Sequence, residues 1–591
     1  MGKIDKFLAG KENNIKTGIL DIVEEYNIEV PMRDGVILRG NIFRPYSESK
    51  FPALLIRTPY GKHEVDLNCW DMRTINIKDA VRAGYVVMVQ DSRGRYTSDG
   101  NFLVDFKEHT GDAEDGYDTV EWLAKQSYCN GNIGTLGVSY RAWMQWELAK
   151  LNPPHLKAMC AFSVPIKMAD VDWTGGIFRM ARRIHWLLNA IAPDMRKRQG
   201  MSKPHTPEEA KEIWNNFPFE RWFNFLPWID FPKYLPKGLA KDVRKWLGDP
   251  KSRIVKPAED TYKKIKVPNL DLSGWYDHCG ETMKNLIGMQ NNASTDIART
   301  QTKLVIGPWN HTGLGKRKIG DIDFGPLAEV NTHDMIIRWF DHWLKGLDNG
   351  IEQEPAVRYF VMGSGKWKIA NTWPLKDIKQ SIYYLDSNGQ ANQMSDIGTL
   401  SHAIPQESIF DIYSYDPKDP VPTIWTKEFF TIPSDRSLLH YRQDILRYRT
   451  MPLEEDIEIV GYPEVEIYAS SSAIDTDFFV RLADESHDGT TLEVSSGVVR
   501  ARYRNSLERE DLLTPGEIVK YRIKLSPTAC CFLKGHRIRL EITSSDFPNF
   551  DRNHNTGKND LFDTELIVAH QKIYHSKEYP SKLILELNNN N

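Results

Sequence analysis

The chain has 591 residues, more than the roughly 250–300 at which one hydrophobic core usually stops growing, so two to four domains are expected. Apolar residues make up 41% and charged residues 26%, a globular composition that excludes fibrous and disordered proteins. The formal charge of -4 argues against a surface for nucleic acid or an anionic membrane, and no apolar run approaches the roughly 20 residues of a membrane span.

The six cysteines are sparse and show neither CxxC nor metal-like spacing. The first residues, MGKIDKFLAGKENN, contain no apolar stretch typical of a secretion signal. Both features predict an unexported, cytoplasmic protein without disulfides and without a bound metal. The cysteines are Cys69, Cys129, Cys160, Cys279, Cys530 and Cys531.

The first strand-like pattern covers residues 28–45, where apolar and polar residues alternate around the turn dipeptide Asp34-Gly35. This pattern predicts an antiparallel hairpin. Short apolar runs then alternate with longer amphipathic segments such as DAEDGYDTVEWLAKQ, which predicts a parallel sheet wrapped by helices. The runs are residues 53–56, 85–89, 133–138, 157–162, 269–272 and 304–306.

The fourth and fifth runs are separated by about a hundred residues, too many for a loop. This stretch is rich in Trp, Arg and Lys, as in GGIFRMARRIHWLLNAI, and is predicted to be an inserted helical cap. Beyond Gln353 the pattern changes to alternating strands such as DFFVRLAD between turn residues, which predicts an antiparallel sandwich. The predicted parts are residues 1–165 and 267–352 for an α/β core, 166–266 for the cap and 353–591 for the sandwich.

A candidate nucleophile follows the third apolar run. Ser139 stands in Gly137-Val138-Ser139-Tyr140-Arg141-Ala142, before the helical pattern WMQWELAKL. A serine on a tight strand-to-helix turn exposes its hydroxyl, and the next amide points at the developing oxyanion. Arg141 replaces the second glycine usual in this motif, and taken alone the serine fits a helix cap equally well.

Two further candidates follow later runs. Asp277 ends Ser273-Gly274-Trp275-Tyr276-Asp277, and His311 ends Gly307-Pro308-Trp309-Asn310-His311. Each alone would more often be a turn residue or a surface group. The carboxyl ends of strands in an open α/β sheet lie at one edge, so Ser139, Asp277 and His311 are expected to converge there. Their order along the chain is that of the α/β-hydrolases.

These segments resemble the cocaine-esterase-like (CocE/NonD) hydrolases, which are relatives of the X-Pro dipeptidyl-peptidases and the α-amino-acid ester hydrolases. The resemblance also covers Arg57-Thr58-Pro59-Tyr60, Asp91-Ser92-Arg93-Gly94, GVVRARYR and GHRIRLEITSSDFPNFDRN. It implies an α/β-hydrolase core, an inserted helical cap and a C-terminal jelly-roll-like sandwich. It also implies that Ser139 is the nucleophile, Asp277 the acid and His311 the base, with an oxyanion hole formed by the Tyr60 hydroxyl and the Tyr140 amide.

In the family, aromatic side chains of the cap and sandwich surround the acyl pocket, which would place Trp173 or Trp186 there, although core packing is the commoner role of such residues. Arg141 is a candidate for an anionic substrate group, and Cys279 for the pocket wall. The amino-acid ester hydrolases and X-Pro peptidases must bind an α-ammonium with carboxylates. Here only Glu281 follows Asp277 closely, which favours a carboxylesterase or acylase over an aminopeptidase.

The predicted function is therefore that of a serine hydrolase that cleaves an ester or amide of a small acyl substrate without a cofactor. An X-Pro dipeptidyl-peptidase or α-amino-acid ester hydrolase is the first alternative. A second alternative is a binding protein that kept the fold without the activity, which the Arg141 and Ala142 departures suggest. Jelly-roll faces and cap helices often supply subunit contacts, so a homo-oligomer is compatible with the sequence.

Overall fold

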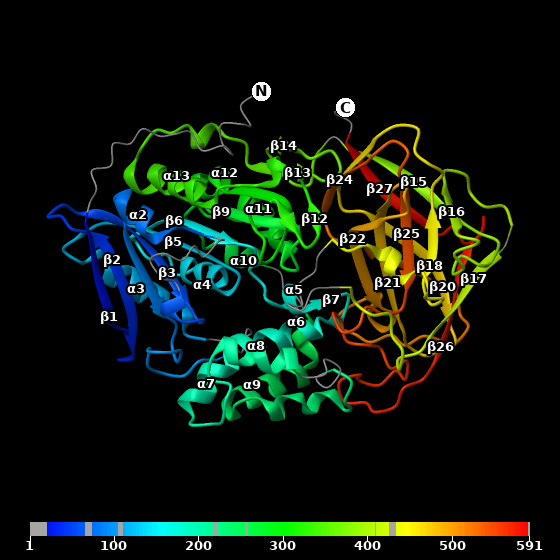
Figure 1. Cartoon of the computed structure of the whole chain (residues 1–591), viewed down its shortest axis with the longest axis horizontal. Helices are drawn as coiled ribbons and strands as arrows, with labels where there is room; N and C mark the ends of the chain where they lie inside the picture. The colour runs from blue at the N-terminus through cyan, green and yellow to red at the C-terminus, as the bar shows by residue number, and fades with distance from the viewer. Residues whose placement is uncertain are drawn as a thin grey trace.

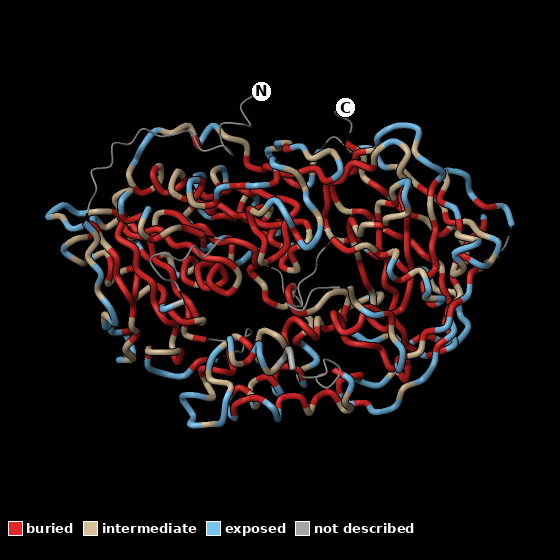
Figure 2. Tube along the Cα trace, in the orientation of Figure 1, coloured by how far each residue is buried: buried red, intermediate tan, exposed pale blue. Residues whose placement is uncertain are grey.

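The structure is a computed structural model that describes residues 21–64, 74–103, 110–216, 223–254, 258–376, 378–407, 409–424 and 433–588. Figure 1 shows three parts: a sheet with helices on both faces, a helical segment below it and a β-sandwich beside both. In each part the buried residues lie along the interior of the trace, as Figure 2 shows. No helix in the described ranges has both the length and the apolar content needed to cross a bilayer.

The core sheet begins with the predicted hairpin, which turns at Gly35 with φ 84°. The first six strands have the order β1-β2-β4-β3-β5-β6, with parallel pairing from β4 through β3 and β5 to β6. Parallel strands of this kind need helical crossovers, as the alternating sequence pattern predicts. The strands are β1 (Ile22–Pro31), β2 (Ile37–Pro45), β3 (Phe51–Thr58), β4 (Val86–Asp91), β5 (Cys129–Val138) and β6 (Leu156–Phe162).

A second group of strands continues this sheet. Residue Met159 of β6 bridges in parallel to Asn269, and the Asn269 side chain accepts a hydrogen bond of 2.8 Å from the Ala161 amide. The strand order then runs β9-β10-β13-β14. These strands are β9 (Leu270–Tyr276), β10 (Lys303–Asn310), β13 (Val357–Val361) and β14 (Lys366–Ala370).

This arrangement differs from the sequence-based boundary after residue 352, which assigns β13 and β14 to the sandwich. Strand β13 instead pairs in parallel with β10, and β14 adds an antiparallel edge to the core sheet. A short strand carries the same alternating pattern whichever sheet it joins, so its partner is decided by tertiary packing.

Helices cover both faces of the core sheet. Because side chains alternate along a strand, Leu54 and Ile56 of β3 pack in one hydrophobic cluster with residues of α2 and α13, whereas Ala53 and Leu55 pack in a second cluster with α3 and α4. The helices of the core are α2 (Ile77–Arg82), α3 (Asp112–Ala124), α4 (Tyr140–Ala149), α11 (Met283–Asn292), α12 (Asp296–Gln301) and α13 (Thr332–Lys345).

The segment between β6 and β9 is mainly helical, as expected for a cap (Figure 1). Within it a one-turn π-helix, η2 (Trp186–Ile191), joins α6 to α7, and π-helical turns are frequent at functional sites. The other elements are α5 (Ala169–Asp172), β7 (Trp173–Thr174), β8 (Ile177–Phe178), α6 (Met180–His185), α7 (Ala192–Arg198), α8 (Pro207–Asn216), η4 (Trp228–Tyr234), α9 (Lys237–Gly248), η5 (Pro250–Arg253) and α10 (Glu259–Tyr262).

The sandwich is a mainly antiparallel array in which ten strands form the path β17-β26-β20-β27-β15-β16-β18-β25-β21-β22 and the rest pair beside it; the β16–β18 pair is parallel. Its strands are β15 (Ile378–Asp386), β16 (Gly398–Ser401), β17 (Ile409–Tyr415), β18 (Leu446–Arg449), β19 (Ile457–Gly461), β20 (Glu464–Ser471), β21 (Asp477–Glu485), β22 (Thr491–Arg500), β23 (Val519–Lys524), β24 (Thr528–Phe532), β25 (Arg537–Thr543), β26 (Ala569–His575) and β27 (Lys582–Asn588).

The cap and the sandwich are locked together at the β7–β8 hairpin. Gly175 has φ 56°, its carbonyl accepts a hydrogen bond of 2.9 Å from the Arg500 amide, and a Cβ there would lie 2.1 Å from the Val498 carbonyl oxygen. Only glycine fits so close to another backbone. The chain that leads into α6 is therefore held by the sandwich as well as by the cap.

Candidate active site

Ser139 lies at the turn between β5 and α4 and has an unusual backbone conformation. Its φ of 62° and ψ of -126° fall in a region that costs a non-glycine residue on the order of 1–3 kcal/mol. The conformation is held by hydrogen bonds from the Ser139 amide to the Phe162 carbonyl, at 3.0 Å, and from the Ala142 and Trp143 amides to the Ser139 carbonyl, both at 2.9 Å. Such a strained and well-supported turn is typical of a nucleophile elbow.

The turn also explains why Arg141 can replace the usual second glycine. Gly137 has φ 154°, and a Cβ on it would lie 2.6 Å from the Arg141 Cβ, which is closer than two carbon atoms can pack. The absence of a side chain at residue 137 thus provides the space that Arg141 needs. The departure from the common motif is accommodated without widening the turn.

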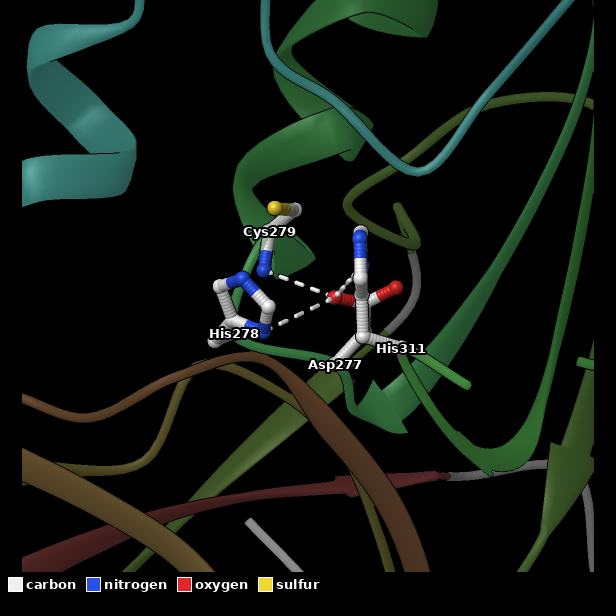
Figure 3. Close-up of side chains that lie close together, drawn as sticks. All are labelled: Asp277, His278, Cys279 and His311. Atoms are coloured by element: carbon white, nitrogen blue, oxygen red, sulfur yellow. Dashed lines mark hydrogen bonds and ion pairs between the residues drawn. The ribbon is translucent and has the colours of Figure 1, made fainter. Parts of the chain in front are cut away.

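Asp277 and His311 follow the neighbouring strands β9 and β10. The His311 Nδ1 lies 2.9 Å from an Asp277 carboxylate oxygen, which also accepts a hydrogen bond of 2.8 Å from the Cys279 amide (Figure 3). Burial by itself would raise the pKa of Asp277, but the interactions with His311 and the Cys279 amide outweigh it and lower the pKa below its usual value. The carboxylate is therefore ionised and able to stabilise an imidazolium.

Ser139 and His311 line one cavity of about 380 Å³ between the core and the cap. Asp277 is not part of its lining and contacts it through His311. Of the other residues predicted from the sequence, this cavity is lined by Tyr60, Tyr140, Arg141, Trp186 and Cys279. Residues far apart in the chain thus meet at the carboxyl ends of the core strands, as the strand-end argument predicts.

Two predicted pocket residues lie elsewhere. Trp173 lines a separate hollow between the cap and the sandwich, where its ring packs 5.1 Å from that of Phe178. Glu281 does not line the catalytic cavity and forms an ion pair of 3.0 Å with Lys284. The position of a residue in the sequence does not determine which way its side chain points. The structure therefore corrects the prediction that Trp173 and Glu281 line the acyl pocket.

The oxyanion-hole candidates are held by specific contacts. The Trp186 Nε1–H donates to the Tyr60 hydroxyl oxygen at 3.0 Å, which leaves the Tyr60 O–H to donate to another acceptor. The Tyr140 hydroxyl donates to Asp112 at 3.0 Å, and its ring stacks on that of Trp186 at 6.0 Å. These contacts fix Tyr60 and anchor the first turn of α4, in which Tyr140 is the first residue.

The cavity has features that the motifs did not indicate. Arg179, Arg182 and Arg183 project from the start of α6 into its lining, and the His278 ring lies 4.4 Å from the His311 ring. The basic run RMARRIH was visible in the sequence, but a helix of six residues gives too little periodicity to show which of its arginines face a site.

Asp277, His278, Cys279 and His311 also offer ligand atoms within 4.8 Å of one another, the one such group in the described part of the chain (Figure 3). Burial and the charge of Asp277 raise the pKa of the Cys279 thiol well above its usual value, so it is a neutral and weak ligand. The positive charges of Arg179, Arg182 and Arg183 lie close enough to the same thiol to lower its pKa, although burial outweighs them. Their positive charge opposes a further cation, and the group fits proton transfer better than metal binding.

The sandwich contains a second cluster of the same residue types. Ser387 donates to Asp411 at 2.8 Å, and the His575 Nε2 lies 3.0 Å from Asp411 and 3.1 Å from the Ser387 hydroxyl. The His575 Nε2 faces both groups, and the Nδ1 on its far side lies 3.7 Å from the Asp386 carboxylate, beyond hydrogen-bond distance, so the arrangement is not that of a catalytic relay. Asp411 and His575 are fully buried and Ser387 is half-buried, and we interpret the cluster as structural.

Comparisons with known proteins agree with this architecture. The model of the X-Pro dipeptidyl-peptidase (S15 family) matches residues 34–313, and that of the X-Pro dipeptidyl-peptidase C-terminal non-catalytic domain matches residues 349–584. A cocaine esterase from Rhodococcus sp. (strain MB1 Bresler) is 32% identical over 582 residues, which are 95% of this chain and 98% of that protein.

Solved structures show the same fold. An α-amino-acid ester hydrolase has a TM-score of 0.78 at 24% identity, with 100% of both chains covered. An aminopeptidase from the marine sediment archaeon Thaumarchaeota archaeon has a TM-score of 0.77 at 23% identity, with 99% of this chain and 100% of that chain covered. Taken with the match to the cocaine esterase over nearly its whole length, these findings show that the chain belongs to the cocaine-esterase-like (CocE/NonD) family of serine hydrolases, which act on ester or amide bonds.

Proposed function

We propose that the protein is a carboxylesterase or acylase that works through a Ser139 acyl-enzyme, with His311 as general base and Asp277 as its orienting acid. The observation that carries the proposal is the 2.9 Å hydrogen bond between His311 and Asp277 beside the cavity that also exposes Ser139. An ionised Asp277 favours the tautomer in which the His311 Nδ1 carries a proton, and in this tautomer the Nε2 can accept the Ser139 proton.

In the acylation step, the His311 Nε2 takes the Ser139 proton while the Ser139 Oγ bonds to the acyl carbon. The carbonyl oxygen becomes an oxyanion that accepts hydrogen bonds from the Tyr60 hydroxyl and the Tyr140 amide. His311 then gives its proton to the leaving alcohol or amine as the bond to the acyl carbon breaks.

In the deacylation step, water replaces the leaving group. The His311 Nε2 takes a proton from water while the water oxygen bonds to the acyl carbon. The same two donors stabilise the second oxyanion. When the acyl–Oγ bond breaks, Ser139 recovers the proton from His311 and the carboxylic acid is released.

An X-Pro dipeptidyl-peptidase or an α-amino-acid ester hydrolase remains the alternative. Such an enzyme must compensate the α-ammonium of its substrate with carboxylates. Two carboxylates line the cavity: Asp172 accepts a hydrogen bond of 2.7 Å from the Arg183 Nε, and Glu208 is exposed to water. The acyl pocket is therefore poorly suited to a cation, which supports the carboxylesterase or acylase.

The test is turnover of p-nitrophenyl butyrate compared with Gly-Pro-p-nitroanilide, with a fluorophosphonate to label the nucleophile. We expect a burst of p-nitrophenol, labelling of wild-type protein only, and loss of both in Ser139→Ala. Equal turnover by wild type and Ser139→Ala would refute the role of Ser139, and preference for the dipeptide would favour the alternative.

The expected partner is a small ester or amide substrate. We also propose that the enzyme works in the cytoplasm, because the described cysteines are unpaired thiols, including the adjacent Cys530 and Cys531.

A further inference from the structure

The wall of the catalytic cavity is strongly cationic. Two carboxylates line it, Asp172 and Glu208. Five cationic side chains line it, Arg141, Arg179, Arg182, Arg183 and Lys211. Arg141, Arg182 and Arg183 are each at most 8% exposed, so their charges are only weakly screened by water.

The nearby carboxylates do not cancel this charge. Asp172 forms an ion pair with Arg183, and Glu208 is exposed, so water screens its charge. The other carboxylates whose charges act on Arg179 or Arg182 each have another partner, which is the His311 imidazole for Asp277 and a cation for Asp546 and Glu281. These pairs are Asp277 with His311 at 2.9 Å, Asp546 with Arg481 at 3.0 Å, and Glu281 with Lys284 at 3.0 Å.

Arg179 and Arg182 stand three residues apart at the start of α6 and line both the catalytic cavity and an adjoining hollow of about 90 Å³ toward the sandwich. The Arg179 Nε donates to the Thr174 hydroxyl at 3.0 Å, and its guanidinium lies 4.8 Å from the Phe550 ring centre. Burial, and next the charge of Arg179, lower the pKa of Arg182 to about 9. Two like charges held together in a desolvated place disfavour each other.

The fold nevertheless holds both arginines in place. The Phe178 amide donates to the Asp551 carboxylate at 3.1 Å, and the Ala181 amide donates to the Pro548 carbonyl at 3.0 Å. These bonds tie the start of α6 to a loop of the sandwich. The arginines are thus positioned before any substrate binds, which lowers the entropic cost of using them for recognition.

We propose, on the basis of the serine-hydrolase function above, that the substrate carries a carboxylate or an equivalent anionic group that binds to Arg179 and Arg182. An anion placed between two guanidinium groups forms charge-assisted hydrogen bonds and relieves their mutual repulsion. An ammonium group in the same place would be repelled. The enzyme would then cleave the ester or amide of a dicarboxylic acid, or one whose leaving group is acidic.

The experiment measures kcat/KM by acid release in a pH-stat for matched alkyl esters. Monoethyl glutarate, ethyl pentanoate and ethyl 4-aminobutyrate present an anionic, a neutral and a cationic acyl chain of similar length. O-Acetylglycolate and ethyl acetate test an anion on the leaving group. We expect the anionic member of at least one set to be preferred over its neutral partner by about tenfold or more, and the cationic ester to be poorest.

The same ratios are then measured in Arg182→Gln and Arg179→Gln. We expect each variant to lower the anionic-to-neutral ratio by about tenfold, because one charge-assisted contact is lost, and Arg182→Lys to retain most of it. Lys197→Gln is the matched control, because Lys197 is an exposed cation of the cap outside the cavity lining, and it should leave the ratio unchanged. If the glutamine variants do not fold, competitive inhibition of the wild type decides: glutarate should inhibit more strongly than neutral pentanamide, and equal inhibition would overturn the anion site.

The outcomes separate this inference from the function on which it rests. Turnover of the neutral esters through Ser139 with no anion preference in either set overturns the anion site and leaves the hydrolase intact. Wild-type ratios in both glutamine variants overturn the assignment to Arg179 and Arg182. Absence of fluorophosphonate labelling at Ser139 overturns the proposed function itself.

Discussion

Replacing Tyr60 by phenylalanine tests the oxyanion hole most directly. The substitution removes one oxygen atom and keeps the ring that packs 5.6 Å from the Arg141 guanidinium. If the Tyr60 hydroxyl donates to the oxyanion, its loss should lower kcat by about 10²–10³-fold, equivalent to about 2.7–4 kcal/mol of transition-state stabilisation. KM should change little, because the contact forms mainly in the transition state.

The substitution has a separate cost in stability. The Trp186 Nε1–H loses the acceptor that now lies 3.0 Å away. Since Tyr60 and Trp186 are both only partly buried, water can replace part of this bond, and we expect a loss of about 1 kcal/mol. Tyr60→Phe/Trp186→Phe removes donor and acceptor together and should recover that stability, while kcat stays low.

The assay combines pre-steady-state and steady-state hydrolysis of p-nitrophenyl butyrate with urea unfolding of wild type, both single variants and the double variant. Trp186→Phe alone should lower kcat by about tenfold or less, because it frees the Tyr60 ring without removing the hydroxyl. A kcat for Tyr60→Phe within threefold of wild type, with normal Ser139 acylation, would show that the phenol is not an oxyanion donor.

Four further outcomes are expected. Asp277→Asn should lower kcat by about 10⁴-fold with an unchanged circular dichroism spectrum, and a small effect would contradict the role of Asp277. Gly137→Ala should lower Tm by several degrees because the new methyl group meets the Arg141 Cβ, and adding Arg141→Gly should recover part of it. Burial raises the pKa of Asp271 to about 7. Between about pH 4 and 7 the folded chain therefore keeps a proton on Asp271 that the unfolded chain has lost. This proton stabilises the folded chain fully below about pH 4, and its contribution to the free energy of unfolding disappears as the pH rises through 7. Urea unfolding at several pH values should show a flatter profile for Asp271→Asn, and an unaltered slope would assign the titration to another group. EDTA should leave turnover unchanged, since no step of the mechanism uses a metal, and reversible loss of activity would contradict this.

Much of the fold follows from local patterns. The turn dipeptide Asp34-Gly35 and the flanking alternation predict the β1–β2 hairpin, because a tight turn needs a residue that accepts a positive φ. The alternation of buried runs with amphipathic segments predicts the parallel core sheet. The sequence pattern groups β13 with the sandwich strands, whereas β13 pairs in parallel with β10, since a strand of five residues has no local feature that distinguishes a parallel core neighbour from an antiparallel sandwich neighbour.

In the candidate site, too, some residues could be predicted from the sequence and others could not. Trp173 and Trp186 are thirteen positions apart in one aromatic and basic stretch, yet only Trp186 reaches the cavity, where it bonds Tyr60. The direction of each ring depends on the π-helical turn and on the hairpin held by the sandwich, neither of which the sequence pattern revealed.

The sequence by itself determined where the residues of the proposed triad stand, at the ends of three core strands. Parallel strands bring their carboxyl ends to one edge, so the order of Ser139, Asp277 and His311 along the chain was enough to predict their meeting. The tertiary structure alone decided that the cavity is cationic. The net charge around Arg179 and Arg182 depends on which carboxylates lie near them and which of those carboxylates have other partners. The order of residues along the chain is given by the sequence, whereas the charges that surround a side chain depend on packing between segments far apart in the sequence.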